Sequence, residues 1–167
     1  MPTTYEPIAT TTLGSAASTI TFSSISSAYT DLRVVLVGTL SATGYLPQLR
    51  LNNVSTGTLY SYTTLVGNGT AASSGRQSNQ NVFEWGDFGL NSTTIPFLAT
   101  VDIFSYAGST NKTCLFTLNN DNNGSGDVTR MVGLFRSTSA ITEVNIRQAS
   151  TTYAAGTTAT LYGILKA

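Results

Sequence analysis

Hydrophobic and polar residues alternate along most of the chain, which is the pattern of β-strands that bury one face. The alternation is clearest near the C-terminus, where Leu161 and Leu165 face one way and Thr160 and Tyr162 the other. No stretch shows a sustained helical period of 3.6 with charges on its outer face. The pattern predicts strands over residues 19–25, 29–40, 47–51, 58–66, 82–90, 95–106, 113–118, 128–135, 141–146 and 157–165.

Turn-forming residues separate these segments, for example at 41–44, 52–57 and 119–127. About eight to ten short strands with turns between them indicate an all-β protein and argue against a βαβ fold. We therefore predict an antiparallel β-sandwich or jelly roll. Segment 29–40 is hydrophobic on both sides, so we expect both faces of that strand to be covered. Segment 67–81 contains glycines and no large aliphatic residue, and we expect a surface loop there.

The first seventeen residues differ from the rest because they are rich in Thr, Ala and Ser and contain Pro2 and Pro7. Proline favours extended backbone at its neighbours. We predict an extended N-terminal arm over residues 1–17 and a β-sandwich domain over 18–167. Tyr5 and Ile8, together with the two prolines, are the arm residues most suited to contact a partner.

Charge is scarce in the sequence. Its 167 residues include 8 Lys and Arg against 8 Asp and Glu, so the formal net charge is zero. A protein that binds nucleic acid through phosphates needs a basic surplus, so we expect no nucleic-acid partner. The few charges offer one local pair, Asp31 and Arg33, which we expect to lie on one face of a strand and to interact.

Histidine is absent, and Cys114 is the single cysteine. The usual general base at neutral pH is therefore missing, as are an intramolecular disulfide and a cysteine-based zinc site. We predict no cofactor and no resident metal. The longest apolar run, at 32–40, contains Arg33 and is too short to span a bilayer, so no membrane association is expected. The N-terminus does not resemble a signal peptide, which predicts synthesis in a cytoplasm.

Trp85, the single tryptophan, lies between Glu84 and Asp87. Two carboxylates beside an aromatic ring are what a glycosidase requires, although such pairs are common in sheets and a structural strand is the simpler interpretation. Trp85 could also stack on a sugar ring, or it could anchor the core or a subunit interface. The tyrosines that would complete a sugar-stacking platform are Tyr60, Tyr62 and Tyr106.

Residues 121–127 carry oxygen-bearing side chains at alternate positions, which resembles the beginning of a calcium-binding loop. A complete loop of the EF-hand type would need a carboxylate at position 132, which is Val132. The other interpretation is a solvated turn. The sequence favours the turn and leaves calcium as an alternative.

Several segments resemble a group of small virion proteins of tailed bacteriophages. They are YEPIATTTL at 5–13, ITFSSI at 20–25, YTDLRVVL at 29–36, LRLN at 49–52 followed by Tyr60, YAAG at 153–156 and LYGI at 161–164. The resemblance covers nearly the whole chain and implies a β-sandwich or jelly-roll protein that decorates or cements the head shell, or that forms part of a tail or fibre.

The resemblance and the residue pattern together predict a structural protein and no enzyme. The first hypothesis is a capsid cement or decoration subunit on the virion surface, whose partners are the major capsid protein and other copies of itself, as a trimer or dimer. Its contacts are expected at Pro2, Tyr5, Pro7, Ile8 and Trp85. The alternative is a phage tail or fibre-associated protein that binds a host surface glycan through Trp85 and nearby tyrosines.

Overall fold

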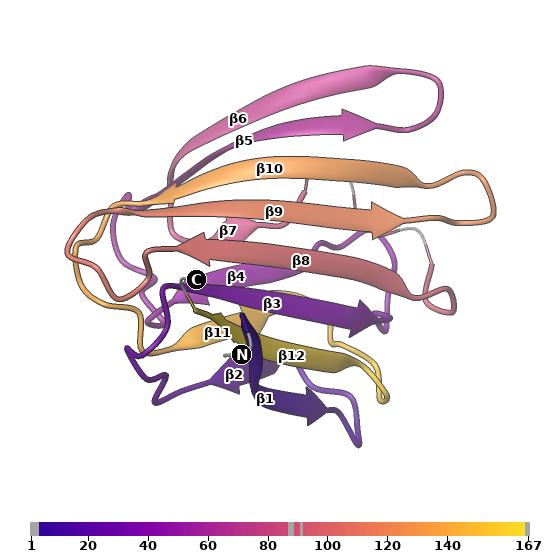
Figure 1. The fold of residues 1–167 in the computed structure, drawn as a ribbon. Helices are drawn as coiled ribbons and strands as arrows, with labels where there is room; N and C mark the ends of the chain where they lie inside the picture. The colour runs from indigo at the N-terminus through magenta and orange to yellow at the C-terminus, as the bar shows by residue number, and fades with distance from the viewer. Residues whose placement is uncertain (1–3, 87–88, 91, 166–167) are drawn as a thin grey trace.

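The computed structural model describes residues 4–86, 89–90 and 92–165. The described chain forms two antiparallel sheets that pack as a β-sandwich, which confirms the predicted fold class (Figure 1). The strands are β1 (Tyr5–Thr12), β2 (Thr19–Phe22), β3 (Asp31–Gly38), β4 (Gln48–Leu51), β5 (Tyr60–Gly67), β6 (Ala72–Gln80), β7 (Phe83–Glu84), β8 (Phe97–Phe104), β9 (Lys112–Asn120), β10 (Asp127–Phe135), β11 (Val144–Arg147) and β12 (Thr158–Ile164).

The two sheets differ in size. The large sheet has eight strands in the order β1-β12-β3-β8-β9-β10-β5-β6, and the small sheet has four in the order β2-β11-β4-β7. Figure 1 shows the large sheet in front, with the shorter strands of the small sheet behind it. One face of the large sheet therefore packs on the small sheet, and the other face is turned away from it.

The core lies between the sheets because alternate side chains point inwards from each strand. In β8, Phe97, Ala99, Val101 and Ile103 are buried, and Leu98 and Phe104 between and beyond them are exposed. Space is tight at this interface. A Cβ added at Gly133 would approach the Phe83 ring to 2.6 Å, so glycine there makes room for an aromatic side chain.

Each predicted strand has a counterpart among the observed strands, and most ends differ by a few residues. The described part of segment 82–90 contains the two-residue strand β7 and is otherwise not strand. The other exception is the expected loop at 67–81, which contains β6 (Ala72–Gln80), the outermost strand beside β5. The sequence ASSGRQSNQ of β6 is exposed along nearly all its length. A strand that buries neither face has no need of alternating hydrophobic residues, which is why its sequence resembles a loop.

The N-terminal segment is extended, as predicted, but it is also part of the large sheet. Tyr5–Thr12 forms the edge strand β1, which pairs with β12 from Tyr5↔Ile164 to Thr12↔Thr158. Backbone contact with the C-terminal region continues beyond the strand, since Leu13 N donates to Thr157 O at 2.9 Å and Ala17 N to Tyr153 O at 3.1 Å. Pairing of this kind needs no large side chain, so composition alone does not reveal it.

No helix capable of crossing a membrane is found among the residues that the structure describes.

Candidate interaction surface

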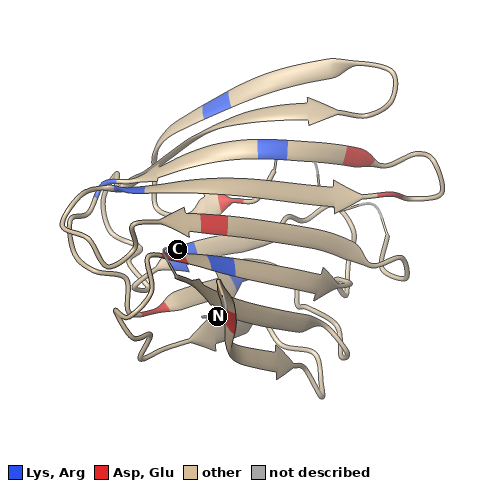
Figure 2. Cartoon of the chain, in the orientation of Figure 1, with Lys and Arg blue, Asp and Glu red and all other residues tan. Residues whose placement is uncertain are grey.

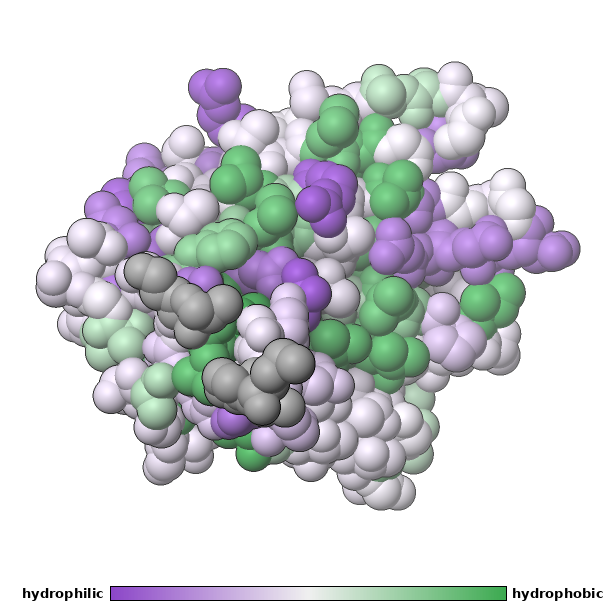
Figure 3. All heavy atoms as spheres, viewed as in Figure 1, coloured by the Kyte–Doolittle hydropathy of each residue, from purple (hydrophilic) through white to green (hydrophobic). Residues whose placement is uncertain are grey.

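The face of the large sheet that is turned away from the small sheet, here called the outer face, carries most of the exposed large hydrophobic side chains. Seven such residues lie on it and are between 39% and 57% exposed. They come from β1, β3, β5, β8 and β10, so they extend across the sheet. Figure 3 shows hydrophobic residues over these strands with polar residues between them. The seven are Tyr5, Val37, Leu65, Leu98, Phe104, Val128 and Val132.

The outer face follows from the register of the strands. Val37 lies opposite Leu98 on β8, and Val132 lies opposite Leu115 on β9. Threonines fill many of the remaining positions, such as Thr100 opposite Thr117. β-branched side chains suit such a pleated surface. The prediction that both faces of segment 29–40 are covered is wrong at Val37, which is 42% exposed.

Charges on the outer face are few (Figure 2). Arg33 on β3 and Asp102 on β8 form an ion pair, and Arg130 on β10 donates to the Thr117 hydroxyl. Arg33 binds Asp102 through two bonds, Nε to Oδ1 at 2.6 Å and Nη2 to Oδ2 at 2.7 Å. The guanidinium carbon also lies 5.6 Å from the centre of the Tyr5 ring. The hydrogen bonds to Asp102 raise the pKa of Arg33, so the guanidinium stays protonated.

The expected pairing of Asp31 with Arg33 is wrong. Asp31 Oδ1 instead accepts a hydrogen bond from the backbone N–H of Ser105 at 2.6 Å. Arg33 has its partner on the neighbouring strand because β3 pairs with β8 in the register Arg33↔Asp102. Directly opposite side chains in an antiparallel pair are closer than side chains two residues apart on one strand.

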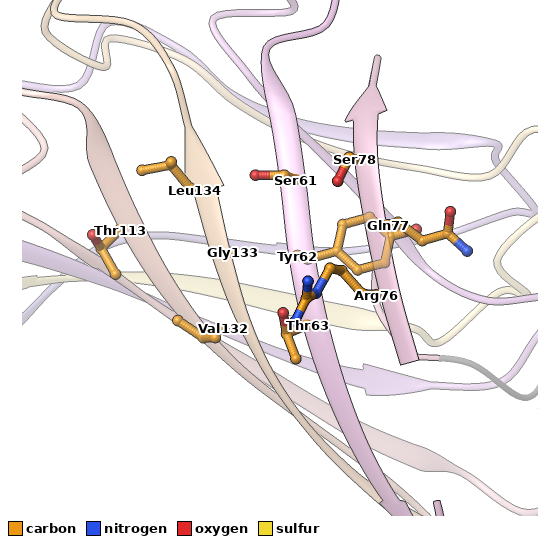
Figure 4. A pocket seen from close by; sticks show the side chains of 10 residues that line it. All are labelled: Ser61, Tyr62, Thr63, Arg76, Gln77, Ser78, Thr113, Val132, Gly133 and Leu134. Atoms are coloured by element: carbon orange, nitrogen blue, oxygen red, sulfur yellow. The ribbon is translucent and has the colours of Figure 1, made fainter. Parts of the chain in front are cut away.

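The outer face is hollowed where β5, β6, β9 and β10 meet. The hollow has a volume of about 310 Å³, and its floor is formed partly by Gly133. Figure 4 shows Thr63 and Arg76 close together on one side, with Val132 and Leu134 on the neighbouring strand. Its lining combines hydroxyl groups, one guanidinium and aliphatic groups, and it contains no carboxylate. The hollow is therefore a shape feature of the outer face with a mixed polar and aliphatic lining.

Trp85 does not lie on a surface. It is 0% exposed, its Nε1 donates to Thr100 O at 3.2 Å, and its ring meets Phe116 edge-on at 5.4 Å. The hypothesis that Trp85 contacts a partner or a glycan is therefore not supported by this fold, because its ring belongs to the core. The tyrosines proposed for the same platform are also buried, with exposed fractions of 0% for Tyr60 and Tyr106 and 4% for Tyr62.

The suggested carboxylate pair beside Trp85 is only half described, because Asp87 lies outside the described residues. Glu84 is exposed on the short strand β7. Its oxygens accept hydrogen bonds from Gln48 Nε2 at 3.3 Å and from the Tyr62 hydroxyl at 3.4 Å. Glu84 thus links β7 to β4 within the small sheet and to β5 of the large sheet.

Hydrogen bonds within the loop at 121–127 satisfy several of its polar groups, whereas the buried Asp127 Oδ1 has no hydrogen-bond partner among the described residues. Asp121 Oδ1 accepts from the N–H of Gly124 at 2.8 Å, and the Ser125 hydroxyl donates to Asn122 O at 2.8 Å. These bonds are typical of a turn. Within the described ranges, no three Asp, Glu, Cys or His residues lie close enough to hold a metal ion.

Two nucleophilic side chains are buried rather than presented. Cys114 is 0% exposed, and burial raises the pKa of its thiol. Lys112 is also buried, and its Nζ donates to Gly108 O at 2.6 Å and to Thr110 O. Lys112 therefore closes the turn between β8 and β9, and neither residue is available to a substrate.

The arm residues expected to contact a partner occupy different positions. Pro2 lies outside the described residues. Tyr5 is 46% exposed on the outer face, and Pro7 is exposed on the sheet edge. Ile8 is partly buried against the core. Tyr5 is thus the predicted contact residue that lies with the other exposed hydrophobic residues.

Comparison with models of known protein families gives no match, and comparison with curated proteins gives no significant match.

Proposed function

We propose that this protein is a structural subunit of a tailed-bacteriophage virion, which decorates or cements the head shell. The sequence segments that resemble small virion proteins support this proposal, and so does the absence of histidine from a chain with zero net charge. In the proposal the outer face of the large sheet contacts the shell. The protein acts by binding, and no covalent chemistry is assigned to it.

The observation that carries the proposal is the set of exposed hydrophobic residues on the outer face. Single exposed hydrophobic residues are normal, but a group on one face indicates an interaction site. Seven of the eight exposed large hydrophobic residues in the described chain lie there, and the eighth, Tyr45, lies elsewhere. The face belongs to a continuous hydrogen-bonded sheet, so its side chains are held in place before binding.

The geometry suits attachment in many copies. Threonine and paired charges between the hydrophobic residues keep the free subunit soluble, and they can form a polar rim after binding. A modest contact by each subunit becomes tight when many contacts act together on a shell or when subunits are linked to one another.

The test is binding of the purified protein to empty heads, followed by sedimentation of the heads. We expect Leu65→Ser combined with Val132→Ser to reduce occupancy at least tenfold, because both side chains lie in the proposed contact face. Tyr45→Ser is the matched control, since it removes an exposed aromatic side chain outside that face. Equal occupancy for the wild type and the double variant would contradict attachment through the outer face.

The alternative, a tail or fibre-associated protein that binds a glycan, was based on Trp85 and the neighbouring tyrosines. Because these rings are buried, no observation on the described chain favours it. Electron microscopy of intact particles would distinguish the two locations. Density for this sandwich on the head would support the proposal, and density on the tail alone would overturn it.

A further inference from the structure

We propose that β6 is a self-association edge, through which a second copy of this chain extends the large sheet. This inference adds a mode of self-association to the proposed function and does not require attachment to a shell. It rests on the contrast between the two edges of the large sheet and on the sequence of β6.

The edge at β1 carries features that prevent strand addition. Pro7 lacks a backbone N–H, and the register shifts between Pro7 and Ala9. Glu6 places a carboxylate in the same strand. Proline, irregular register and charge are common means by which natural sheets protect an edge.

The edge at β6 has almost none of these features. The strand is nine residues long, contains no proline, and has Arg76 as its single charged residue. From Ala72 to Gln77 its register with β5 is regular, and the irregularity comes only after Gln77. No described strand lies beyond it. The edges of the small sheet, β2 and β7, have four and two residues and offer much shorter templates.

The hairpin geometry shows which backbone groups of β6 point outwards. Asn68 N donates to Ala71 O across the β5–β6 turn at 3.2 Å, so these two residues form a hydrogen-bonded pair. Hydrogen-bonded and non-hydrogen-bonded pairs alternate along an antiparallel ladder. Ser73 and Gly75 therefore bond to β5, and the N–H and C=O groups of Ala72, Ser74 and Arg76 point away from it.

These outward groups define a self-complementary register. With a twofold axis at Gly75, Ser74 of one copy pairs with Arg76 of the second copy, and both residues have outward backbone groups. Gly75 then faces Gly75 in a non-hydrogen-bonded pair, where the Cα atoms approach to about 4.5 Å and a small residue fits well. A register with the axis at Arg76 would place two guanidinium groups opposite one another, which is unfavourable.

This arrangement has a consequence for the outer face. Directly opposite residues of an antiparallel pair point to the same side of a sheet. The two outer faces would therefore lie on the same side of one continuous sheet. A dimer of this kind would present both sets of exposed hydrophobic residues to one surface, which strengthens binding without any new contact.

Sedimentation equilibrium over a wide concentration range tests the self-association. We expect the wild type to approach twice the chain mass of 17.5 kDa. Ser74→Pro should remain monomeric, because it removes an outward N–H while the bonds between β5 and β6 stay in place. Ser74→Thr is the matched control that keeps the N–H and should dimerise. A wild type that is monomeric throughout would overturn the proposal.

The register has its own test. Gly75→Cys should form an intermolecular disulfide on mild oxidation, because the predicted Cα separation lies within the range that disulfides span. Ser73→Cys should not, since in this register residue 73 lies opposite residue 77 rather than itself. The natural thiol of Cys114 is buried and gives little background. Crosslinking of Ser73→Cys but not of Gly75→Cys would overturn the twofold axis at Gly75.

Hydrogen exchange provides a measurement that needs no variant. In the wild type, the amides of Ser74 and Arg76 should become protected as concentration rises, and amides that stay unprotected at every concentration would overturn the proposal. If Ser74→Pro is monomeric and still binds empty heads, self-association and shell attachment are separate. If the wild type is monomeric and Ser74→Pro alone loses shell binding, β6 pairs with the shell instead of a second copy, which overturns the proposal.

Discussion

Four large aromatic residues combine a buried ring with a satisfied polar tip. Trp85 donates to Thr100 O, Tyr60 to Val54 O, Tyr106 to Ser26 O and Tyr153 to Arg147 O. All four are 0% exposed. Tyrosine and tryptophan in a sequence give equal support to a stacking surface and to a core, because their rings suit both. Whether such a residue lies in the core depends on a hydrogen-bond partner for its polar tip, and only the folded structure provides that partner.

The burial of Trp85 predicts its fluorescence. As the single tryptophan in the sequence, it should emit at short wavelength in the native protein and resist quenching by acrylamide. Trp85→Phe should lower the free energy of unfolding by about 1–3 kcal/mol, because the Thr100 carbonyl loses its donor and the smaller ring leaves space. Native emission that is quenched as strongly as that of the chain in denaturant would show that the ring is exposed.

The burial of Tyr60 predicts a pH dependence at the alkaline end. Desolvation raises the pKa of Tyr60 from 10.0 to about 12 in the folded state. The folded state therefore binds the proton more tightly, so this contribution to stability is complete below pH 10 and is lost as the pH rises towards about 12. Urea unfolding of the wild type and of Tyr60→Phe measures it. The wild type should lose more stability than the variant across this interval, and parallel losses would contradict the assignment.

Among the elements, the two edge strands of the large sheet show how the sequence pattern succeeds and fails. β3, β8 and β12 have alternating burial, and the hydrophobic pattern predicts them. β6 buries neither face, and β1 buries little of either, so neither has the pattern of a half-buried strand. The strand state of β1 depends on hydrogen bonds to β12 at the other end of the chain, and that of β6 depends on hydrogen bonds to the preceding strand β5.

The role of β1 can be tested by deletion. Removing residues 1–12 would uncover the edge of β12 and would also remove the hydroxyl contacts Thr10–Thr160 at 3.1 Å and Thr12–Thr158 at 3.0 Å. We expect a lower melting temperature and aggregation detectable by light scattering, because an exposed central strand templates pairing. Removing residues 1–3 alone is the control. An unchanged melting temperature after the longer deletion would show instead that the segment acts as an independent arm.

At the scale of the whole molecule, the zero net charge of the chain and the exposed hydrophobic residues of the outer face both favour binding through apolar contacts. The sequence has equal numbers of basic and acidic residues, and the central pair on the outer face, Arg33 and Asp102, neutralises itself. The pair is partly buried, with exposed side-chain fractions of 37% for Arg33 and 14% for Asp102. Attachment through such a surface depends on apolar contact more than on charge.

Because the chain has equal numbers of basic and acidic residues, its binding to the shell should depend only weakly on salt concentration. Occupancy on empty heads should change less than about threefold between low and physiological ionic strength, since the outer face carries few charges that salt could screen. Binding isotherms at several salt concentrations measure it. A steep fall in affinity with salt would indicate attachment through charges and would contradict an apolar contact face.

The alternation of hydrophobic and polar residues determined the all-β class and most strand positions, because a period of two is imposed by the strand itself. The composition determined that charged and titratable groups are scarce. Tertiary structure alone decided which face of each strand is covered, that Arg33 pairs with Asp102 rather than Asp31, and that Trp85 belongs to the core. It also decided that β6 is a strand. The pairing of Arg33 and the burial of Trp85 depend on contacts between segments far apart in the chain. β6 pairs with its neighbour β5 but buries neither face, so its sequence lacks the pattern of a strand.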